Sequence, residues 1–206
     1  MLIHINQLDL SKTYTYTDYL KWQFKTRVEL ILGKVFKMSP APSPIHQEVV
    51  SALNAALYHF LKEKDCKVFP APFDVRLDRD QNGIHTVVQP DICVICDLQK
   101  IDERGCNGAP DLIIEIISPA TARKDLHEKY DLYERSGVNE YWIIHPFERT
   151  LTTFRLQMNG TYQPGKPLTE GDQVISAVIE GFTLNLSDVF PTRVEEPLEN
   201  YTDNRI

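Results

Sequence analysis

Three acidic residues interrupt apolar segments and are the first candidates for chemistry. Asp91 opens the segment DICVIC, Glu115 lies within DLIIEII, and Glu29 begins ELIL. An ionised carboxylate costs free energy to bury unless a cation or hydrogen-bond donors compensate it. A lone acid on a strand is usually a solvated strand end. Glu115 departs from that expectation because aliphatic residues flank it on both sides.

Strand periodicity places some of these acids on common faces. Side chains alternate along a strand, so Asp111 shares a face with Glu115, and Asp91 shares one with Cys93. If the two strands are neighbours, Asp91 and Glu115 converge on one hard cation. Mg²⁺ is typically held by one or two carboxylates together with water and substrate phosphate. Such an ion polarises a phosphate and lowers the pKa of a bound water.

A basic and an aromatic side chain follow on the next predicted helix. Asp125, Lys129 and Tyr133 are spaced by four residues, which places them on one helix face. From that face Lys129 could reach back to the strand that carries Glu115. The alternative is a surface ion pair between Asp125 and Lys129, which contributes only a few tenths of a kcal/mol.

His46 is a further candidate, two residues after Pro44 in the first turn of a long predicted helix. A histidine there could bind phosphate or a metal, or transfer protons near neutral pH. The alternative is an exposed or capping histidine. The sequence pattern leaves both interpretations open.

The elements that must position these residues alternate between strands and helices, which predicts an α/β fold with a mixed sheet and helices packed on it. A helix within 44–64 follows the 3.6-residue period, with Ser43 as its N-cap. A strand at 111–117 leads to a helix over 120–136 that stops at Gly137. The remaining expected elements are a short helix near Thr17, two strands around Gly33, a turn at 81–83, a strand near 87–96, a strand at EYWIIHP, a hairpin at Asn159-Gly160, and β structure to about Phe190.

Length and composition indicate one globular domain. The chain has 206 residues and 42% hydrophobic content, which predicts a single domain over 1–190 and a polar tail over 191–206. It contains no run of about 20 apolar residues, and its start lacks the organisation of a signal peptide. We therefore expect a cytoplasmic protein without a membrane span. The net charge of −7 means that binding to nucleic acid would need a local cluster of cations.

The four cysteines suggest a metal site only weakly. Cys93 and Cys96 form a CxxC, but within a strand residues three apart point to opposite faces. Structural zinc sites usually have two such pairs on turns. We therefore expect reduced, partly buried thiols, in agreement with a reducing compartment.

Three segments together resemble a known family: ELILGKVFKMSPAPSPIHQ, QPDICVICD and GAPDLIIEIISPATARKDLHEKYDLYERSGVNEYWIIHP. They are similar to the Uma2 (DUF820) family, a bacterial group of restriction-endonuclease-like proteins in the PD-(D/E)xK nuclease superfamily. The resemblance extends from about Tyr14 to Phe190. It implies a restriction-endonuclease-like α/β fold, in which α-helices flank a central mixed β-sheet that carries extra β-hairpins.

The resemblance also implies roles for individual residues. Asp91 of QPD matches the first acid and Glu115 the second, whereas Ile117 stands where the superfamily pattern has its lysine. Some branches supply that lysine from the following helix, and Lys129 matches this position. Glu29 and His46 match family positions near the site, and Glu29 is a possible third metal acid. Asp111 matches a position that is as suited to shaping the start of the strand as to binding metal. Asp125 and Tyr133 match positions that orient the lysine.

The implied activity is hydrolysis of DNA phosphodiester bonds by an endonuclease or nickase that uses Mg²⁺ or Mn²⁺ bound to Asp91 and Glu115. Superfamily members often act as homodimers, so a dimer is plausible. The acidic charge balance favours an alternative, a non-catalytic nucleic-acid or protein binding module that retains the fold. A third hypothesis is hydrolysis of a smaller phosphodiester.

Overall fold

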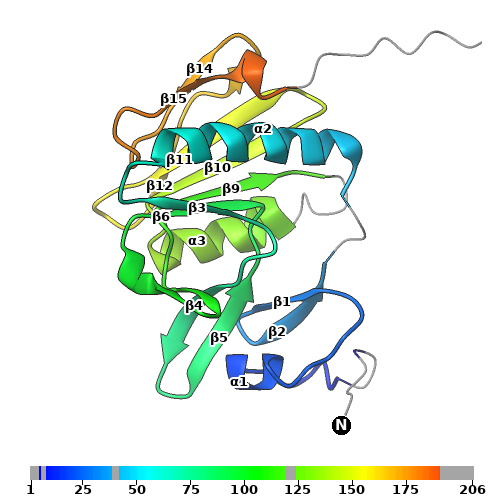
Figure 1. The fold of residues 1–206 in the computed structure, drawn as a ribbon. Coiled ribbons are helices and arrows are strands. Elements are labelled where there is room, and N and C mark those ends of the chain that lie inside the picture. Colours follow the sequence, from blue (N-terminus) through cyan, green and yellow to red (C-terminus); the bar gives the residue numbers. More distant parts are fainter. Residues whose placement is uncertain (1–4, 6–7, 39–41, 119–123, 191–206) are drawn as a thin grey trace, which may run out of the picture.

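The computed structural model describes residues 5, 8–38, 42–118 and 124–190, excluding the side chains of Lys124 and Asp125. The predicted polar tail lies outside these residues. Two β-sheets and two longer helical segments make up most of the described chain (Figure 1). No helix in the described part is long and apolar enough to cross a membrane.

The larger sheet has the strand order β12-β11-β10-β9-β6-β3, and β13 pairs with β11. Its central strands β9 and β10 are parallel and its other pairs are antiparallel, so the sheet is mixed, as predicted. Its strands are β3 (Lys67–Pro70), β6 (Ile92–Ile95), β9 (Leu112–Ile116), β10 (Glu140–His145), β11 (Thr150–Leu156), β12 (Tyr162–Pro164) and β13 (Leu168–Thr169).

The smaller sheet has the order β2-β1-β5-β4-β8-β7. It carries the hairpin predicted around Gly33 and the hairpin that turns at 81–83. A separate pair, β14 and β15, follows near the C-terminal end. These strands are β1 (Val28–Ile31), β2 (Lys34–Lys37), β4 (Val75–Asp80), β5 (Gly83–Val88), β7 (Ile101–Asp102), β8 (Gly105–Asn107), β14 (Gln173–Ile175) and β15 (Thr183–Asn185).

The helix limits that the structure describes lie close to the predicted positions, while the predicted helix start near residue 120 lies outside the described residues. Ser43 accepts a hydrogen bond from the His46 amide and caps the long helix, as predicted. Gly137 adopts a left-handed conformation (φ 82°) and ends the helix that follows β9. The helical segments are α1 (Tyr16–Tyr19), α2 (Pro44–Leu61), a π-helical turn (Lys124–Lys129), α3 (Tyr130–Ser136), and short 3₁₀ turns at Leu98–Lys100 and Leu186–Asp188.

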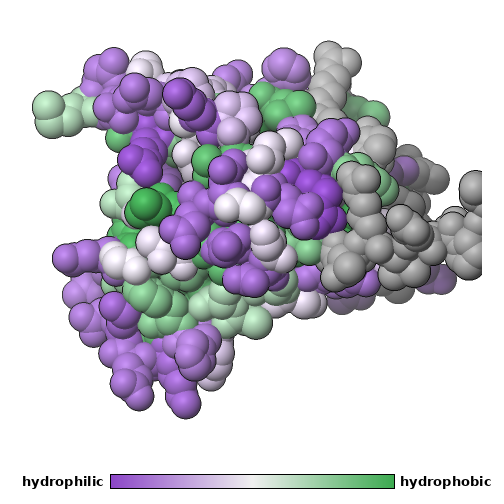
Figure 2. Space-filling view, turned by 90° about the horizontal axis from the view of Figure 1, so that it is seen from above, coloured by the Kyte–Doolittle hydropathy of each residue, from purple (hydrophilic) through white to green (hydrophobic). Residues whose placement is uncertain are grey.

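The larger sheet lies between two hydrophobic cores. On one face its side chains pack against α2 and the C-terminal segment that contains β14 and β15. On the other face they pack against α3 and the smaller sheet. Seen from above, the side of β14 and β15 in Figure 1, the molecule is mostly hydrophilic, with separate hydrophobic patches (Figure 2). Because β9 is covered on both faces, all five of its residues are buried, although every second one belongs to a different core.

Two expectations are wrong. The strand predicted near 87–96 is broken at Gln89–Asp91, and its halves, β5 and β6, belong to different sheets because Pro90 cannot donate to a ladder. Cys66 and Cys96, predicted to be reduced thiols, form a disulfide. They extend the antiparallel pairing of β3 with β6 (Lys67↔Ile95) by one position, so they lie directly opposite each other. The disulfide removes the support that reduced thiols gave to a cytoplasmic location.

Cys93 and Cys106 remain unpaired and buried. Burial raises the pKa of the Cys93 thiol, and it raises that of Cys106 to about 11. We expect a thiol-specific colorimetric reagent to detect two thiols per chain in denaturant without reductant, and four after reduction. Four thiols without reduction would contradict the Cys66–Cys96 bond.

A buried carboxylate joins the larger sheet to the C-terminal segment. Glu140 on β10 is fully buried, and its Oε1 accepts a hydrogen bond from Trp142 Nε1 (2.9 Å). Its Oε2 accepts from Ser176 Oγ (2.6 Å) and from the Ala177 amide (2.9 Å). A buried charge is tolerated where donors surround it in this way. Glu140 therefore has a structural role, outside the candidate chemistry.

We expect Glu140→Ala to lower the free energy of unfolding by about 3 kcal/mol, because it leaves several buried hydrogen-bond donors without an acceptor. Urea denaturation of this variant and of the exposed-site control Glu180→Ala measures the effect. The control should stay within about 0.5 kcal/mol of the wild type. A Glu140→Ala midpoint equal to that of the control would contradict the structural role.

Candidate active site

Asp91 and Glu115 are neighbours across two strands. β6 pairs antiparallel with β9 through Ile92↔Ile114, so the next position of the ladder sets Asp91 opposite Glu115. Asp91 Oδ2 accepts a hydrogen bond from the Ile116 amide at 2.8 Å. The side chain of Asp91 is 21% exposed, whereas that of Glu115 is 5% exposed. The predicted pairing of these acids is therefore present, with one acid open to solvent and the other buried.

Lys129 binds the buried acid. Its Nζ lies 2.7 Å from Glu115 Oε1 and 3.2 Å from Glu29 Oε1. Lys129 is 3% exposed and Glu29 is fully buried, so the surface ion pair considered for Lys129 is wrong. This contact brings together the end of β9, the start of α3 and β1 of the smaller sheet. The cation that compensates Glu115 comes from the helix, the position that the family resemblance implied for the lysine.

Tyr133 is the second donor to Glu115. Its hydroxyl lies 2.8 Å from Glu115 Oε1, and its side chain is fully buried. Burial and the nearby charge of Glu115 raise the pKa of Tyr133 well above its usual value. Tyr133 therefore remains a neutral hydroxyl that donates to the carboxylate.

Lys129 ends a π-helical turn, and Tyr133 lies one turn further along, in α3. Single π turns occur often at functional sites. The predicted role of Asp125 stays a prediction, since its side chain lies outside the described residues. Ile117, expected from the resemblance to stand in place of a lysine, is buried in the core beneath α3.

His46 contacts the exposed acid. Its Nε2 lies 3.2 Å from Asp91 Oδ2, and its side chain is 10% exposed. The exposed histidine considered from the sequence is therefore wrong. His46 Nδ1 is buried and has no hydrogen-bond partner among the described residues. If Nε2 carries the proton and donates it to Asp91, Nδ1 is left as an acceptor.

Asp111 lies at the other end of the strand from this group. Its Oδ2 accepts from the Cys96 amide at 2.7 Å, and its Oδ1 accepts from Asn139 Nδ2 at 3.4 Å. These hydrogen bonds connect the start of β9 to the neighbouring segments at Cys96 and Asn139. They favour the strand-shaping role over metal binding.

Three residues not identified from the sequence extend the buried network. The Gln89 amide donates to Glu29 Oε1 (3.1 Å), and Gln89 Nε2 donates to Asp74 Oδ1 (2.8 Å). Tyr19 OH also approaches Asp74, at 3.4 Å, and burial raises the pKa of the Asp74 carboxyl. Gln89 directly precedes Pro90-Asp91, and this proximity to a candidate acid could have identified Gln89 from the sequence. Nothing in the sequence indicates a role in the site for Asp74 or Tyr19.

The donor set suits a hydrated divalent cation better than a closed metal cage. Among the described residues, no three His, Cys, Asp or Glu side chains are grouped so that they could hold a metal ion. Asp91 and Glu115 nevertheless supply two adjacent carboxylates. Mg²⁺ commonly takes one or two carboxylates and fills its remaining positions with water and phosphate. The residues present therefore fit Mg²⁺ or Mn²⁺ of that kind.

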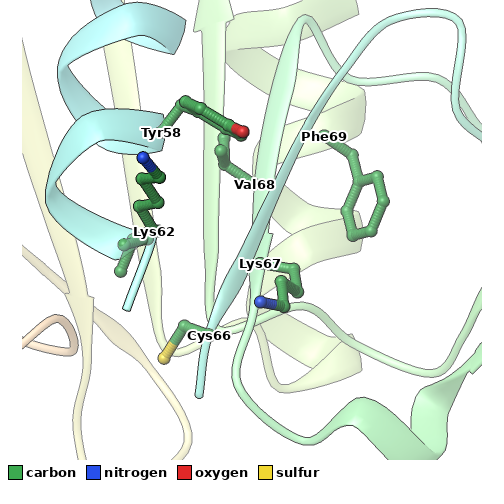
Figure 3. A pocket seen from close by; sticks show the side chains of 7 residues that line it. Tyr58, Lys62, Cys66, Lys67, Val68 and Phe69 are labelled. Atoms are coloured by element: carbon green, nitrogen blue, oxygen red, sulfur yellow. The ribbon is translucent and has the colours of Figure 1, made fainter. Parts of the chain in front are cut away.

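A pocket of about 270 Å³ lies elsewhere, between the C-terminal end of α2 and β3 (Figure 3). Lys62 from α2 and Lys67 from β3 flank it, beside Cys66. Helix α2 has 18 residues and is therefore about 27 Å long, which separates this end from the first turn, where His46 lies. In Figure 1 that first turn, the end of β9 and the start of α3 lie together on the opposite side. The pocket is therefore separate from the candidate site.

Comparison with known proteins decides the family. The model of the Uma2 family, described as "Putative restriction endonuclease", matches residues 16–187, a span that includes every candidate residue above. The chain belongs to the Uma2 family. Family membership supports a nuclease-like function.

Individual relatives are distant. An "Uncharacterized protein slr1290" of Synechocystis is 23% identical over 129 residues. That match covers 62% of this chain and 65% of the relative, less than two thirds of its length. A crystal structure of a "putative nuclease belonging to DUF820" from Anabaena variabilis superposes with a TM-score of 0.68 at 22% identity, over 85% of this chain and 97% of the other. This likeness establishes the restriction-endonuclease-like α/β fold.

A double-mutant cycle tests the contact between Lys129 and Glu29. We expect Glu29→Gln and Lys129→Met to destabilise the protein singly, and their effects to be non-additive by more than about 1 kcal/mol, because the side chains touch in a buried site. Urea unfolding of the four proteins gives this coupling energy. The pair Glu29→Gln with the exposed-site Lys166→Met is the control and should be additive. Additivity in the first pair would contradict the ion pair.

Proposed function

We propose that this chain is a metal-dependent endonuclease that hydrolyses DNA phosphodiester bonds. The observation that carries the proposal is the buried Lys129 ammonium, held at 2.7 Å from Glu115 beside the partly exposed Asp91. Two adjacent carboxylates can hold a divalent ion that acts on a phosphodiester, and a nearby cation can stabilise charge that develops on the phosphate. Membership in a restriction endonuclease family supports the same reaction.

Asp91 and Glu115 would hold the Mg²⁺ or Mn²⁺ ion. When bound, the ion supplies Lewis acidity to the phosphate and lowers the pKa of a coordinated water. Glu29 as a third metal acid stays a prediction. Its contact with Lys129 gives it a second role, which is to position the ammonium group.

The other residues orient the reacting groups. Lys129 places a positive charge where negative charge develops on the phosphate, or orients the attacking water. Glu29 and Glu115 fix its Nζ, and the Tyr133 hydroxyl holds the Glu115 carboxylate on the same oxygen. His46 Nε2 contacts Asp91 Oδ2 and fixes that carboxylate from the side of α2. Such preorganisation contributes to rate because it requires little rearrangement during the reaction.

The homodimer and the cytoplasmic location expected from the sequence stay predictions. The acidic charge balance still favours the alternative of a binding module without catalysis. The buried Lys129, which is costly to maintain, favours the enzyme.

Metal binding is the first test. We expect calorimetric titration with Mn²⁺ to show binding to the wild type, and Asp91→Ala and Glu115→Ala to abolish it while thermal unfolding remains cooperative. Glu63→Ala, at the far end of α2 from His46, is the matched control and should bind as the wild type does. Equal affinity in all four proteins would rule out this metal site.

Cleavage is a separate test. With Mn²⁺ and plasmid, linear duplex or single-stranded DNA, we expect Lys129→Ala to lower kcat at least about 100-fold, since it removes charge stabilisation at the phosphate. Lys129→Arg, which keeps the charge, and the unfolding midpoint of each variant separate this loss from misfolding. Undiminished cleavage by Lys129→Ala would refute its role. Failure of the wild type to cut any of the three substrates would favour the binding module.

A further inference from the structure

The Cys66–Cys96 disulfide lies in the outermost strand pair of the larger sheet. β3 is the last strand in the order of this sheet, and Cys66 directly precedes it. Position 66 continues the ladder in which Lys67 pairs with Ile95, so the bond crosses from the edge strand to β6. Both cysteines are only partly buried. The bond therefore lies near the surface, at the edge of the sheet.

Cys66 also lines the pocket between the C-terminal end of α2 and β3, which we call the α2–β3 pocket. Figure 3 shows the Cys66 sulfur on the same side of β3 as Lys62. The volume of the pocket is about 270 Å³. Pockets for drug-sized ligands start at about 300 Å³, so this one suits a smaller molecule. A small solute in the pocket therefore lies beside one sulfur of the disulfide.

The other two cysteines cannot serve as partners in exchange with this bond. Cys93 and Cys106 are fully buried and belong to the core beneath α3, whereas Cys66 and Cys96 pack against the core beneath α2. Burial also raises the pKa of both free thiols. The thiolate, and not the thiol, attacks a disulfide. Exchange at the Cys66–Cys96 bond therefore requires a thiol from solution.

The charged side chains that line the α2–β3 pocket are both lysines. Lys62 reaches it from the end of α2, and Lys67 reaches it from β3. Lys67 alternates with Cys66 and Val68, so its side chain starts from the opposite face of this edge strand. Figure 3 accordingly shows Lys62 and Lys67 on the two sides of β3. The ammonium groups thus flank the pocket, and they favour an anionic solute and a thiolate within it.

Other charged residues lie near the pocket without lining it. Lys64 Nζ lies 4.4 Å from the centroid of the Phe60 ring. Glu63 and Asp65 belong to the exposed connection between α2 and β3, and Asp97 directly follows Cys96. These three acids oppose the attraction of an anion from a greater distance. The preference for an anion therefore depends on the two lining lysines, and it weakens as salt screens them.

Contacts other than the disulfide hold both strands in place. β3 pairs with β6 at every position from Lys67 to Pro70, and Val68 packs against the core beneath α2. On the other strand, the Cys96 amide donates to Asp111 Oδ2 at 2.7 Å. These contacts do not involve the sulfur atoms. The bond therefore opens and closes within a folded protein.

We propose that the Cys66–Cys96 bond is a thiol–disulfide exchange site that takes small anionic thiols through the α2–β3 pocket. The incoming thiolate attacks Cys66 Sγ, forms a mixed disulfide there and releases the Cys96 thiolate, which takes up a proton. A second thiolate attacks the sulfur of the bound small thiol and releases the Cys66 thiolate, which is also protonated. The protein disulfide gains two electrons, and two small thiols become one disulfide. This site is independent of the proposed endonuclease function.

The test measures exchange in the oxidised full chain with three probe thiols: mercaptopropionate (anionic), mercaptoethanol (neutral) and cysteamine (cationic). Each rate is expressed per thiolate and divided by the rate with a small uncharged disulfide, because thiols differ in intrinsic reactivity. We expect this ratio to be at least about threefold higher for mercaptopropionate than for cysteamine at about 0.01 M salt, and the difference to shrink at about 1 M. Mass spectrometry after acid quenching should place the first adduct on Cys66.

The double variant Lys62→Gln, Lys67→Gln should lose the preference for the anionic thiol and keep the wild-type rate with mercaptoethanol. That neutral rate shows that the variant is folded. The matched control, Lys12→Gln with Lys166→Gln, removes two exposed lysines elsewhere and should keep the preference. Equal ratios for the three thiols in the wild type, a first adduct on Cys96, or exchange only in denaturant would each overturn the proposal. None of these results affects the proposed endonuclease function.

Discussion

The buried contact of the Lys129 ammonium with Glu115 and Glu29 is the interaction on which the rest of the structure depends. It joins β9 of the larger sheet, β1 of the smaller sheet and the turn that starts α3. Lys129 compensates the charge of both carboxylates, while the Tyr133 hydroxyl is a second donor to Glu115 and the Gln89 amide a second donor to Glu29. Conversely, the two acids compensate the charge of the lysine, which is 3% exposed. The contacts that pack the two sheets together are thus the same contacts that assemble the site.

Local features of the fold were predictable because they depend on a few neighbouring residues. Ser43 and Pro44 predicted the start of α2, Gly137 the end of α3, and the alternation around Ile113 and Glu115 the faces of β9. The spacing of Asp125, Lys129 and Tyr133 allowed Lys129 to approach Glu115 but did not separate that contact from a surface ion pair, and the family resemblance was needed to choose between them.

What the sequence did not predict depends on pairing between distant segments. The separation of β5 from β6 at Gln89–Asp91 requires knowledge of two sheets, and each half alone resembles a continuous strand. The Cys66–Cys96 bond depends on the register of β3 against β6, which no spacing in the chain reveals. The burial of Glu29 likewise depends on which strand covers α3. Glu140 shows that a buried carboxylate need not take part in catalysis, because its hydrogen bonds link β10 to the C-terminal segment.

The two-sided burial of β9 has a consequence for how the chain folds. Ile114 and Ile116 face the leucines of α2, while Ile113 and Glu115 face α3. A slip of β9 by one residue against β6 or β10 would exchange these faces and drive an ionised carboxylate into the all-apolar side. The isoleucines of the strand would otherwise make such a slip nearly neutral, since isoleucine fits either core. The residue assigned to chemistry therefore also selects the native alignment of the central strand from its near misalignments.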